Sequence, residues 1–402
     1  MSSSIVVAPA VRRARIGVAL LFLTNGALFA NILPRYPEIK VQLGLDAATY
    51  GIAIAAFPAG AMVAGLGAAV LIRRFGSAKV AVVGTILTSL GILAAGLAPS
   101  AVFFALGLFL GGAADAITDV GQNAHSLRVQ RGYGRSIINS FHAIWSIGAV
   151  LGGSMSAAAI ALALPLGIHL GISAIVFCVV SLVALRMCLP GRDEVTEEES
   201  IAGGTEISGA LRRGISGKTV FVIFALVLLS IAGAIVEDAG MSWATLYLGA
   251  DLAAPAAIAT TGYIALVGAQ FIGRMIGDGM VDRFGQRAVA QVGGLLIAVG
   301  MGLALAFPTI PGTILGFAVA GFGSATLIPA ALQAADELPG LRHGAGLTIV
   351  SWLLRLGFLL SPPFVGFIAD NAGLRAGLLI VPIAGVVAIA CAGVLERRRA
   401  RT

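Results

Sequence analysis

Residues 73–79 read RRFGSAK and residues 282–287 read DRFGQR, which places Phe75 and Phe284 209 positions apart. Further landmarks keep the same offset: Gly84 and Gly293, Pro99 and Pro308, Gly148 and Gly357. Self-similarity at one fixed spacing is the signature of an internal repeat. The chain of 402 residues is therefore predicted to consist of two related halves.

The composition around these two stretches is that of a membrane protein. Hydrophobic residues make up 58% of the chain, charged residues 11%, and the mean hydropathy is +0.99. A soluble domain carries about 25% charged residues. A soluble fold is therefore excluded.

A helix needs about 20 apolar residues to cross the hydrocarbon core of a bilayer. Runs of this kind occupy 15–33, 50–72, 78–97, 101–126, 136–161, 163–187, 219–247, 255–281, 287–307, 311–335, 342–368 and 373–395. We expect an all-α membrane protein with twelve transmembrane helices in two pseudo-symmetric six-helix bundles, formed by residues 1–188 and 219–402. Residues 189–218 are rich in acidic side chains and are predicted to be a solvated cytoplasmic linker.

The basic residues give the orientation. With the N-terminus in the cytoplasm, 22 of the 26 Lys and Arg fall on the inner side, three fall outside (Arg35, Lys40 and Arg375), and Arg355 lies within a span. This asymmetry is what the positive-inside rule requires. Both termini are therefore expected in the cytoplasm, the first span is read as an uncleaved helix, and the net charge of +7 needs no nucleic-acid partner.

The chain resembles the major facilitator superfamily over nearly its whole length. That family carries G-x-x-x-D-R-x-G followed by basic residues between its second and third helices, and again between its eighth and ninth. The corresponding residues here are Arg73, Arg74 and Gly76 in the first copy, and Asp278, Asp282, Arg283, Gly285 and Arg287 in the second. The resemblance implies that these loops latch the inner gate through charge contacts. Because Arg73 stands where the family has Asp, the implied first latch departs from the pattern.

Three further stretches resemble a bacterial branch of uncharacterised inner-membrane transporters related to fucose-type sugar permeases. They are NGALFANILPRYPEIK (25–40), FHAIWSIG (141–148) and EDAGMSWATLYL (237–248). This resemblance implies the bacterial cytoplasmic membrane as the location. It names no substrate.

The predicted span 101–126 carries a polar stripe within its apolar run. Asp115, Asp119, Gln122 and Asn123 fall on one face at helical spacing. An ionisable residue at membrane depth is costly, so it is a functional candidate by default. We expect Asp115 and Asp119 to bind protons, and Gln122 and Asn123 to line the cavity, against the alternative that Asp119 only bonds a neighbouring helix.

The second half supplies further charged candidates. Glu237 in the span 219–247 is a predicted proton carrier or substrate ligand, whereas Asp238 is expected to be solvated near the outer mouth. Arg355 lies in mid-span and needs a carboxylate such as Asp115 or Glu237, or an anionic substrate. The sequence leaves its partner open.

Several uncharged or weakly basic residues are also predicted to line the cavity. The alternative is that these side chains only pack in the interior. His142 titrates in the range that a proton coupler needs. The tryptophans Trp145, Trp243 and Trp352 are cavity candidates, and Asn25 in helix 1 is a candidate for substrate contact.

These observations predict a secondary transporter that moves a small solute by alternating access and couples it to protons. Uptake of a sugar-like or other polar solute competes with proton-driven efflux. The resemblance disfavours efflux, because the span 136–161 lacks the Gly-Pro pair of the family's drug-antiporter motif. A magnesium-dependent membrane enzyme and a non-transporting receptor are weaker alternatives. The three cysteines lack metal-ligand spacing, so neither a metal nor a cofactor is expected, and the protein is expected to be a monomer.

Overall fold

The computed structural model describes residues 8–65, 67–133, 137–191, 217–338 and 345–396, and in these ranges it is helical without strands. Twelve helical segments among them are long and apolar enough to span a membrane. They are Pro9–Gln42, Ala47–Gly65, Ser77–Gly96, Ala101–Tyr133, Ser140–Ala161, Leu166–Met187, Thr219–Asp251, Ala256–Phe284, Gln286–Ala306, Ile310–Asp336, Ala345–Ala372 and Leu374–Val394. The predicted fold class and span count are confirmed.

The chain divides into two compact units. The first comprises Met1–Leu43 and Ala56–Gly203, and the second comprises Gly44–Ala55 and Gly204–Thr402. The start of the second helix therefore groups with the second unit. The centre of the predicted linker, 192–216, lies outside the described residues, so that prediction stays open.

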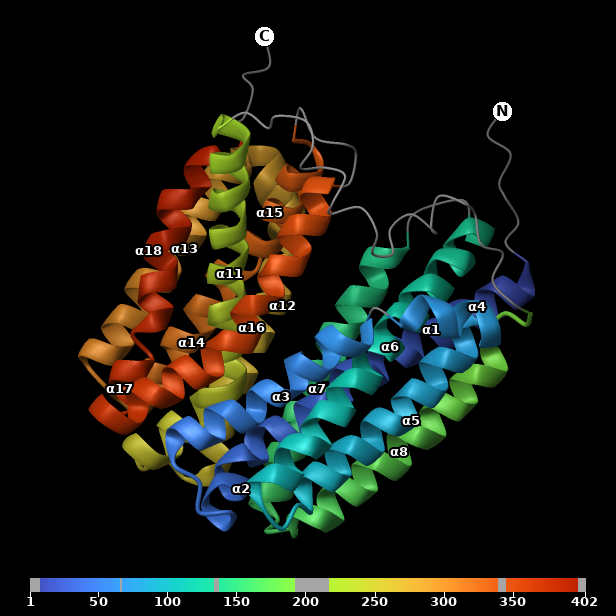
Figure 1. Cartoon of the computed structure of the whole chain (residues 1–402), viewed down its shortest axis with the longest axis horizontal. Coiled ribbons are helices and arrows are strands. Elements are labelled where there is room, and N and C mark those ends of the chain that lie inside the picture. The colour runs from blue at the N-terminus through green and yellow to red at the C-terminus, as the bar shows by residue number, and fades with distance from the viewer. Residues whose placement is uncertain (1–7, 66, 134–136, 192–216, 339–344, 397–402) are drawn as a thin grey trace. The chain divides into compact units, whose positions relative to one another are not determined.

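The first unit contains most of the N-terminal helices (Figure 1). They are α1 (Pro9–Ile32), the 3₁₀ turn η1 (Leu33–Arg35), α2 (Tyr36–Gln42), α3 (Ala47–Gly65, from Ala56 on), α4 (Ala68–Phe75), α5 (Ser77–Gly96), α6 (Ala101–Tyr133), α7 (Ile138–Ala161) and α8 (Leu166–Met187). Pro34 has no backbone N–H to donate, and the first span changes there from an α-helix to η1 before α2 continues it.

The second unit holds the remaining helices and the first residues of α3. They are α11 (Gly217–Leu246), the π-helical turn η2 (Tyr247–Asp251), α12 (Ala256–Phe284), α13 (Gln286–Ala306), α14 (Ile310–Ser324), α15 (Leu327–Asp336), α16 (Ala345–Ala372), α17 (Leu374–Gly377), α18 (Ile380–Cys391) and η3 (Ala392–Val394). The tenth and twelfth spans are interrupted, whereas the apolar runs predicted continuous helices.

Both units use the same scheme of helix pairs. In the first, α1 packs against α7 and α8, and α5 packs against α6 and α8. In the second, α11 packs against α16 and α18, and α13 packs against α14 and α18. These helices correspond through the offset of 209 residues, so the sequence repeat is a structural repeat.

Close glycine contacts repeat at the same offset. A Cβ atom at Gly112 on α6 would collide with the carbonyl oxygen of Phe57 on α3. A Cβ atom at Gly321 on α14 would collide in the same way with the carbonyl oxygen of Leu266 on α12. Small residues that let backbones approach closely are typical of helix packing in membranes.

The two stretches RRFGSAK and DRFGQR also share one backbone geometry. Gly76 has φ 86° and ψ 146°, and Gly285 has φ 85° and ψ 152°, in the region that favours glycine. Each glycine ends one helix and begins the next. The guanidinium carbons of Arg74 and Arg283 each lie 5.3 Å from the ring centre of the following phenylalanine.

Candidate functional site

Three side chains of the first unit form a hydrogen-bonded chain across three helices. The indole Nε1 of Trp145 on α7 donates to Oδ1 of Asn25 on α1 over 2.8 Å. The amide Nδ2 of Asn25 donates to Oδ1 of Asp115 on α6 over 2.7 Å. This Asn–Asp–Trp chain brings together three of the predicted site residues.

Glycines explain why the hydrogen bond between Trp145 and Asn25 can form. A Cβ atom at Gly26 would overlap the carbonyl oxygen of Trp145, and one at Gly148 would overlap that of Leu23. The backbones of α1 and α7 can therefore approach closely enough for the indole to reach the Asn25 amide. The indole can only donate, which fixes the Asn25 oxygen toward Trp145 and its NH₂ group toward the carboxylate.

Asp115 is half-buried, and its hydrogen bond from Asn25 comes from an uncharged donor. Among the residues that the structure describes, no Lys, Arg or His lies within ion-pair distance of it. Its negative charge is therefore balanced within this unit by dipoles alone. Such a carboxylate can exchange a proton, or a hydroxyl group of a solute can bind to it.

The remaining residues of the polar stripe bond to each other. Asp119 is exposed, and its Oδ1 accepts hydrogen bonds from Gln122 over 3.2 Å and from Asn123 over 3.0 Å. Gln122 is fully buried, whereas Asn123 is half-buried. The expected single polar face on this helix is present.

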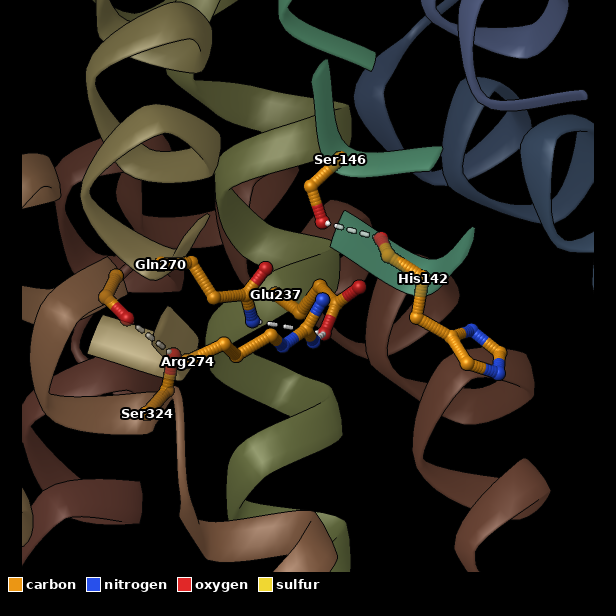
Figure 2. Close-up of polar contacts among 7 residues, drawn as sticks. His142, Ser146, Glu237, Gln270, Arg274 and Ser324 are labelled. Atoms are coloured by element: carbon orange, nitrogen blue, oxygen red, sulfur yellow. Dashed lines mark hydrogen bonds and ion pairs between the residues drawn. The ribbon is translucent and has the colours of Figure 1, made fainter. Parts of the chain in front are cut away.

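A second polar cluster lies in the other unit (Figure 2). Oε2 of Glu237 on α11 accepts a hydrogen bond from Nε2 of Gln270 over 2.9 Å and lies 3.3 Å from a guanidinium nitrogen of Arg274. Gln270 and Arg274 are four residues apart on α12, so both face the same carboxylate. The contacts are those of a charged carboxylate held between two donors.

Arg355 does not take part in this cluster. It is exposed on α16 and forms no ion pair with a described residue of its unit. The expected partner Glu237 is bound to Arg274 instead. Arg274 was counted with the inner-side basic residues, although it lies seven residues before the end of the predicted span 255–281. That position was the signal for this pair.

The other cavity candidates differ in exposure. His142 is exposed, and its ring meets Phe22 edge-on with ring centres 5.3 Å apart. Trp352 is 47% exposed. Trp243 is fully buried and packs edge-on against Tyr50, and its predicted place in the cavity stays a prediction.

The charged residues of the predicted gating loops are exposed on their units, apart from a half-buried Arg287. Within the described ranges, none of them forms an ion pair: Arg73, Arg74, Asp278, Asp282, Arg283 and Arg287. The latch that the resemblance implies therefore stays a prediction.

The sequence did not reveal several buried polar groups, among them His169 and Asp238. His169 on α8 contacts Oδ1 of Asn31 through Nε2 over 2.9 Å, and both side chains are buried. Asp238 was expected to be solvated, but it is only 7% exposed. Both corrections have one cause: the face of a helix that points inward depends on its neighbours, which composition does not specify.

Two repeated units of membrane-spanning helices, each with carboxylates held inside, define a polytopic membrane protein of the transporter type. The family model described as Major Facilitator Superfamily matches residues 18–277 and 238–402. The chain belongs to the Major Facilitator Superfamily, and it is accordingly a transporter of that family.

Its relatives agree with this assignment. It is 27% identical to an uncharacterized transporter, y4wD, of Sinorhizobium fredii over 381 residues, which cover 95% of this chain and 98% of the relative.

Solved structures share the fold. A point mutant of the nucleoside transporter NupG matches with a TM-score of 0.76 and 14% identity, covering 95% of this chain and 100% of that one. The D-xylose-proton symporter matches with a TM-score of 0.70 and 18% identity, covering 95% of each chain. FucP in its outward conformation matches with a TM-score of 0.61 and 19% identity over 95% of this chain and 98% of that one, so the likeness to fucose-type permeases is loose.

Proposed function

We propose that the protein is a secondary active transporter that couples the uptake of a small polar, sugar-like solute to protons by alternating access. The observation that carries this proposal is the Asn–Asp–Trp chain of Asn25, Asp115 and Trp145, which links three helices through one half-buried carboxylate.

Proton binding at Asp115 would change this chain. A neutral carboxyl group is a donor, whereas the carboxylate only accepts. The oxygen of Asn25 already accepts from Trp145, so a proton on the carboxyl oxygen that faces Asn25 would meet a donor. The contacts between α1, α6 and α7 would have to rearrange, which gives protonation a different free energy in different arrangements of the helices. An ion can drive a conformational change only through such a difference.

The same residues suit a hydroxylated solute. An amide and a carboxylate can bind hydroxyl groups, and an indole ring offers an apolar face beside them. The solved structures titled nucleoside transporter and D-xylose-proton symporter carry solutes of this chemical kind. Asp119 and Glu237 are secondary proton-site candidates, although the ion pair with Arg274 gives Glu237 a structural role as well.

We place the protein in the bacterial cytoplasmic membrane with both termini inside. The support is the count of 22 basic residues against three across the predicted topology.

Proton movement induced by a solute tests the proposal. Purified protein in liposomes would be given a panel of sugars and nucleosides without a pH gradient, while a dye reports the external pH. A transported solute should make the medium more alkaline, and Asp115→Asn should abolish this signal, while the exposed-carboxylate control Glu337→Gln should preserve it. Acidification would indicate antiport. Solute entry without any proton movement would refute the coupling.

A further inference from the structure

Asp238 lies in the interior of the second unit without a counter-charge. It is 7% exposed, and its Oδ1 accepts a hydrogen bond of 3.1 Å from Oγ of Ser242, one turn along α11. Among the described residues, no Lys, Arg or His lies within ion-pair distance of it. A buried carboxylate without a paired charge is costly unless something neutralises it.

The arginine that binds the residue next to Asp238 is already paired. Arg274 on α12 binds Glu237, the residue that precedes Asp238. Near Glu237 and Asp238 lie two further titratable side chains, Tyr50 on α3 and Tyr263 on α12, and both are fully buried. Neither side chain supplies a positive charge at physiological pH.

Two buried oxygen atoms at Asp238, its own Oδ2 and Oγ of Ser361 on α16, have no partner with regular hydrogen-bond geometry among the described residues. The Ser361 hydroxyl lies close enough to the carboxylate to stabilise its charged form. Ser361 is 3% exposed. A carboxylate oxygen and a hydroxyl oxygen thus lie together with unused hydrogen-bonding capacity.

The helix that carries Ser361 also has two carbonyl oxygens that its own backbone leaves without a hydrogen bond. Ser361 is followed by Pro362 and Pro363, which lie inside α16 and have no backbone N–H. The carbonyl oxygens of Phe358 and Leu359, one turn earlier, therefore do not receive their usual helical hydrogen bonds. Carboxylate, hydroxyl and carbonyl oxygens are the ligands that hard cations prefer.

Within the unit, Tyr50 on α3 packs against α11 beside Ser242. Tyr50 is fully buried, and its hydroxyl donates to the carbonyl oxygen of Ser242 over 2.7 Å. Its ring packs edge-on against Trp243, with ring centres 5.0 Å apart. Trp243 is thereby a neighbour of the Asp238 group and a natural reporter of its occupancy.

We propose that Asp238, Ser242 and Ser361 form a binding site for a small monovalent cation, either Na⁺ or a proton. The positive charge would neutralise Asp238 and use the unpartnered oxygens of Asp238 and Ser361. The site extends the proposed function, on which it rests, because a cation bound between α11 and α16 could bias alternating access. It is separate from Asp115.

The test measures binding alone, so that its result does not depend on transport through Asp115. Full-length protein carrying Trp145→Phe and Trp352→Phe, with Trp243 as the remaining tryptophan, would be placed in lipid nanodiscs. Emission of Trp243 would be followed while NaCl replaces choline chloride at constant ionic strength, and separately while the pH is varied without Na⁺.

We expect the emission of Trp243 to change in a saturable way with at least one of the two cations. A response to NaCl identifies Na⁺, and a response to pH alone identifies the proton. Asp238→Asn should abolish the change. Ser361→Ala should raise the half-saturating concentration about fivefold or more for Na⁺, which corresponds to the loss of roughly 1 kcal/mol, or shift the midpoint of the pH response.

Ser361→Ala keeps the proposal testable if Asp238→Asn misfolds, because the described contact that the Ser361 hydroxyl loses is the one with Asp238 itself. The matched control is Ser230→Ala on α11, which removes a buried hydroxyl that donates to Leu226 and should leave the titration unchanged. A parent protein without a saturable change, or Asp238 and Ser361 variants that titrate like the parent, would overturn the proposal.

Discussion

The ion pair between Glu237 and Arg274 allows a quantitative prediction. The carboxylate residue is 8% exposed, the arginine side chain is 34% exposed, and the two charged groups are 3.3 Å apart. An exposed pair contributes about 0–1 kcal/mol, whereas removal of one partner from a fully buried pair costs about 3–5 kcal/mol. Because water reaches the arginine, we expect Arg274→Met to cost about 1–2 kcal/mol.

A double-mutant cycle separates this interaction from other effects of the substitutions. Glu237→Gln, Arg274→Met and the double variant would be compared by thermal unfolding in detergent at one fixed scan rate, since unfolding of such proteins is commonly irreversible. For a chain of this size, 1 kcal/mol corresponds to about 1–2 °C, by extrapolation from smaller proteins. We expect Arg274→Met to lower the apparent melting temperature by about 1–4 °C. The double variant should be more stable than the sum of the single effects predicts.

The control is Arg283→Met, which removes an exposed arginine without a described ion pair from the same helix. Its melting temperature should stay within about 1 °C of the parent, as expected for a surface substitution. Strictly additive single effects, or an equal drop in the control, would refute the assigned interaction.

Three further outcomes follow from the packing. Gly112→Ala and Gly321→Ala should each lower the melting temperature, because overpacking costs about 1–3 kcal/mol. Gly171→Ala, where the space around the glycine is open, should be neutral or slightly stabilising. Equal effects at all three positions would contradict the packing. Burial raises the pKa of the Cys188 thiol to about 12, so at pH 8 about one thiol in 10⁴ is ionised, and a variant with only this cysteine should resist maleimide until it is unfolded in SDS. Fast labelling of the folded protein would contradict that burial. Trp145→Phe should weaken solute affinity by about 5–10-fold through the lost hydrogen bond, measured as KM for uptake; an unchanged KM would remove Trp145 from the solute site.

Most of the fold could be predicted because its determinants are local and repetitive. Twelve apolar runs are long enough to cross a bilayer, and the 209-residue offset relates glycines whose close contacts recur in both units, such as Gly112 and Gly321. The helix interruptions near Ser324 and Gly377 were not predicted. A local change of backbone bonding depends on packing against neighbouring helices, and both interruptions lie within continuous apolar runs.

The candidate site was predictable only as a set of residues. Costly polar side chains within apolar runs pointed to Asp115 and Glu237, but the sequence could not say which groups they contact. Position 324, which corresponds to Asp115 in the repeat, is Ser, and position 28, which corresponds to Glu237, is Leu. The repeat therefore predicts the scaffold of each unit, while the polar chemistry differs between them.

If Asp115 couples solute movement to protons, accumulation against a gradient requires this carboxylate, whereas exchange of solute across the membrane does not. Parent and Asp115→Asn proteins would be compared in liposomes for accumulation of a transported solute against its gradient, driven by a pH difference, and for exchange of labelled against unlabelled solute without one. We expect Asp115→Asn to lose accumulation and to keep exchange. Accumulation by the variant at the level of the parent would contradict it.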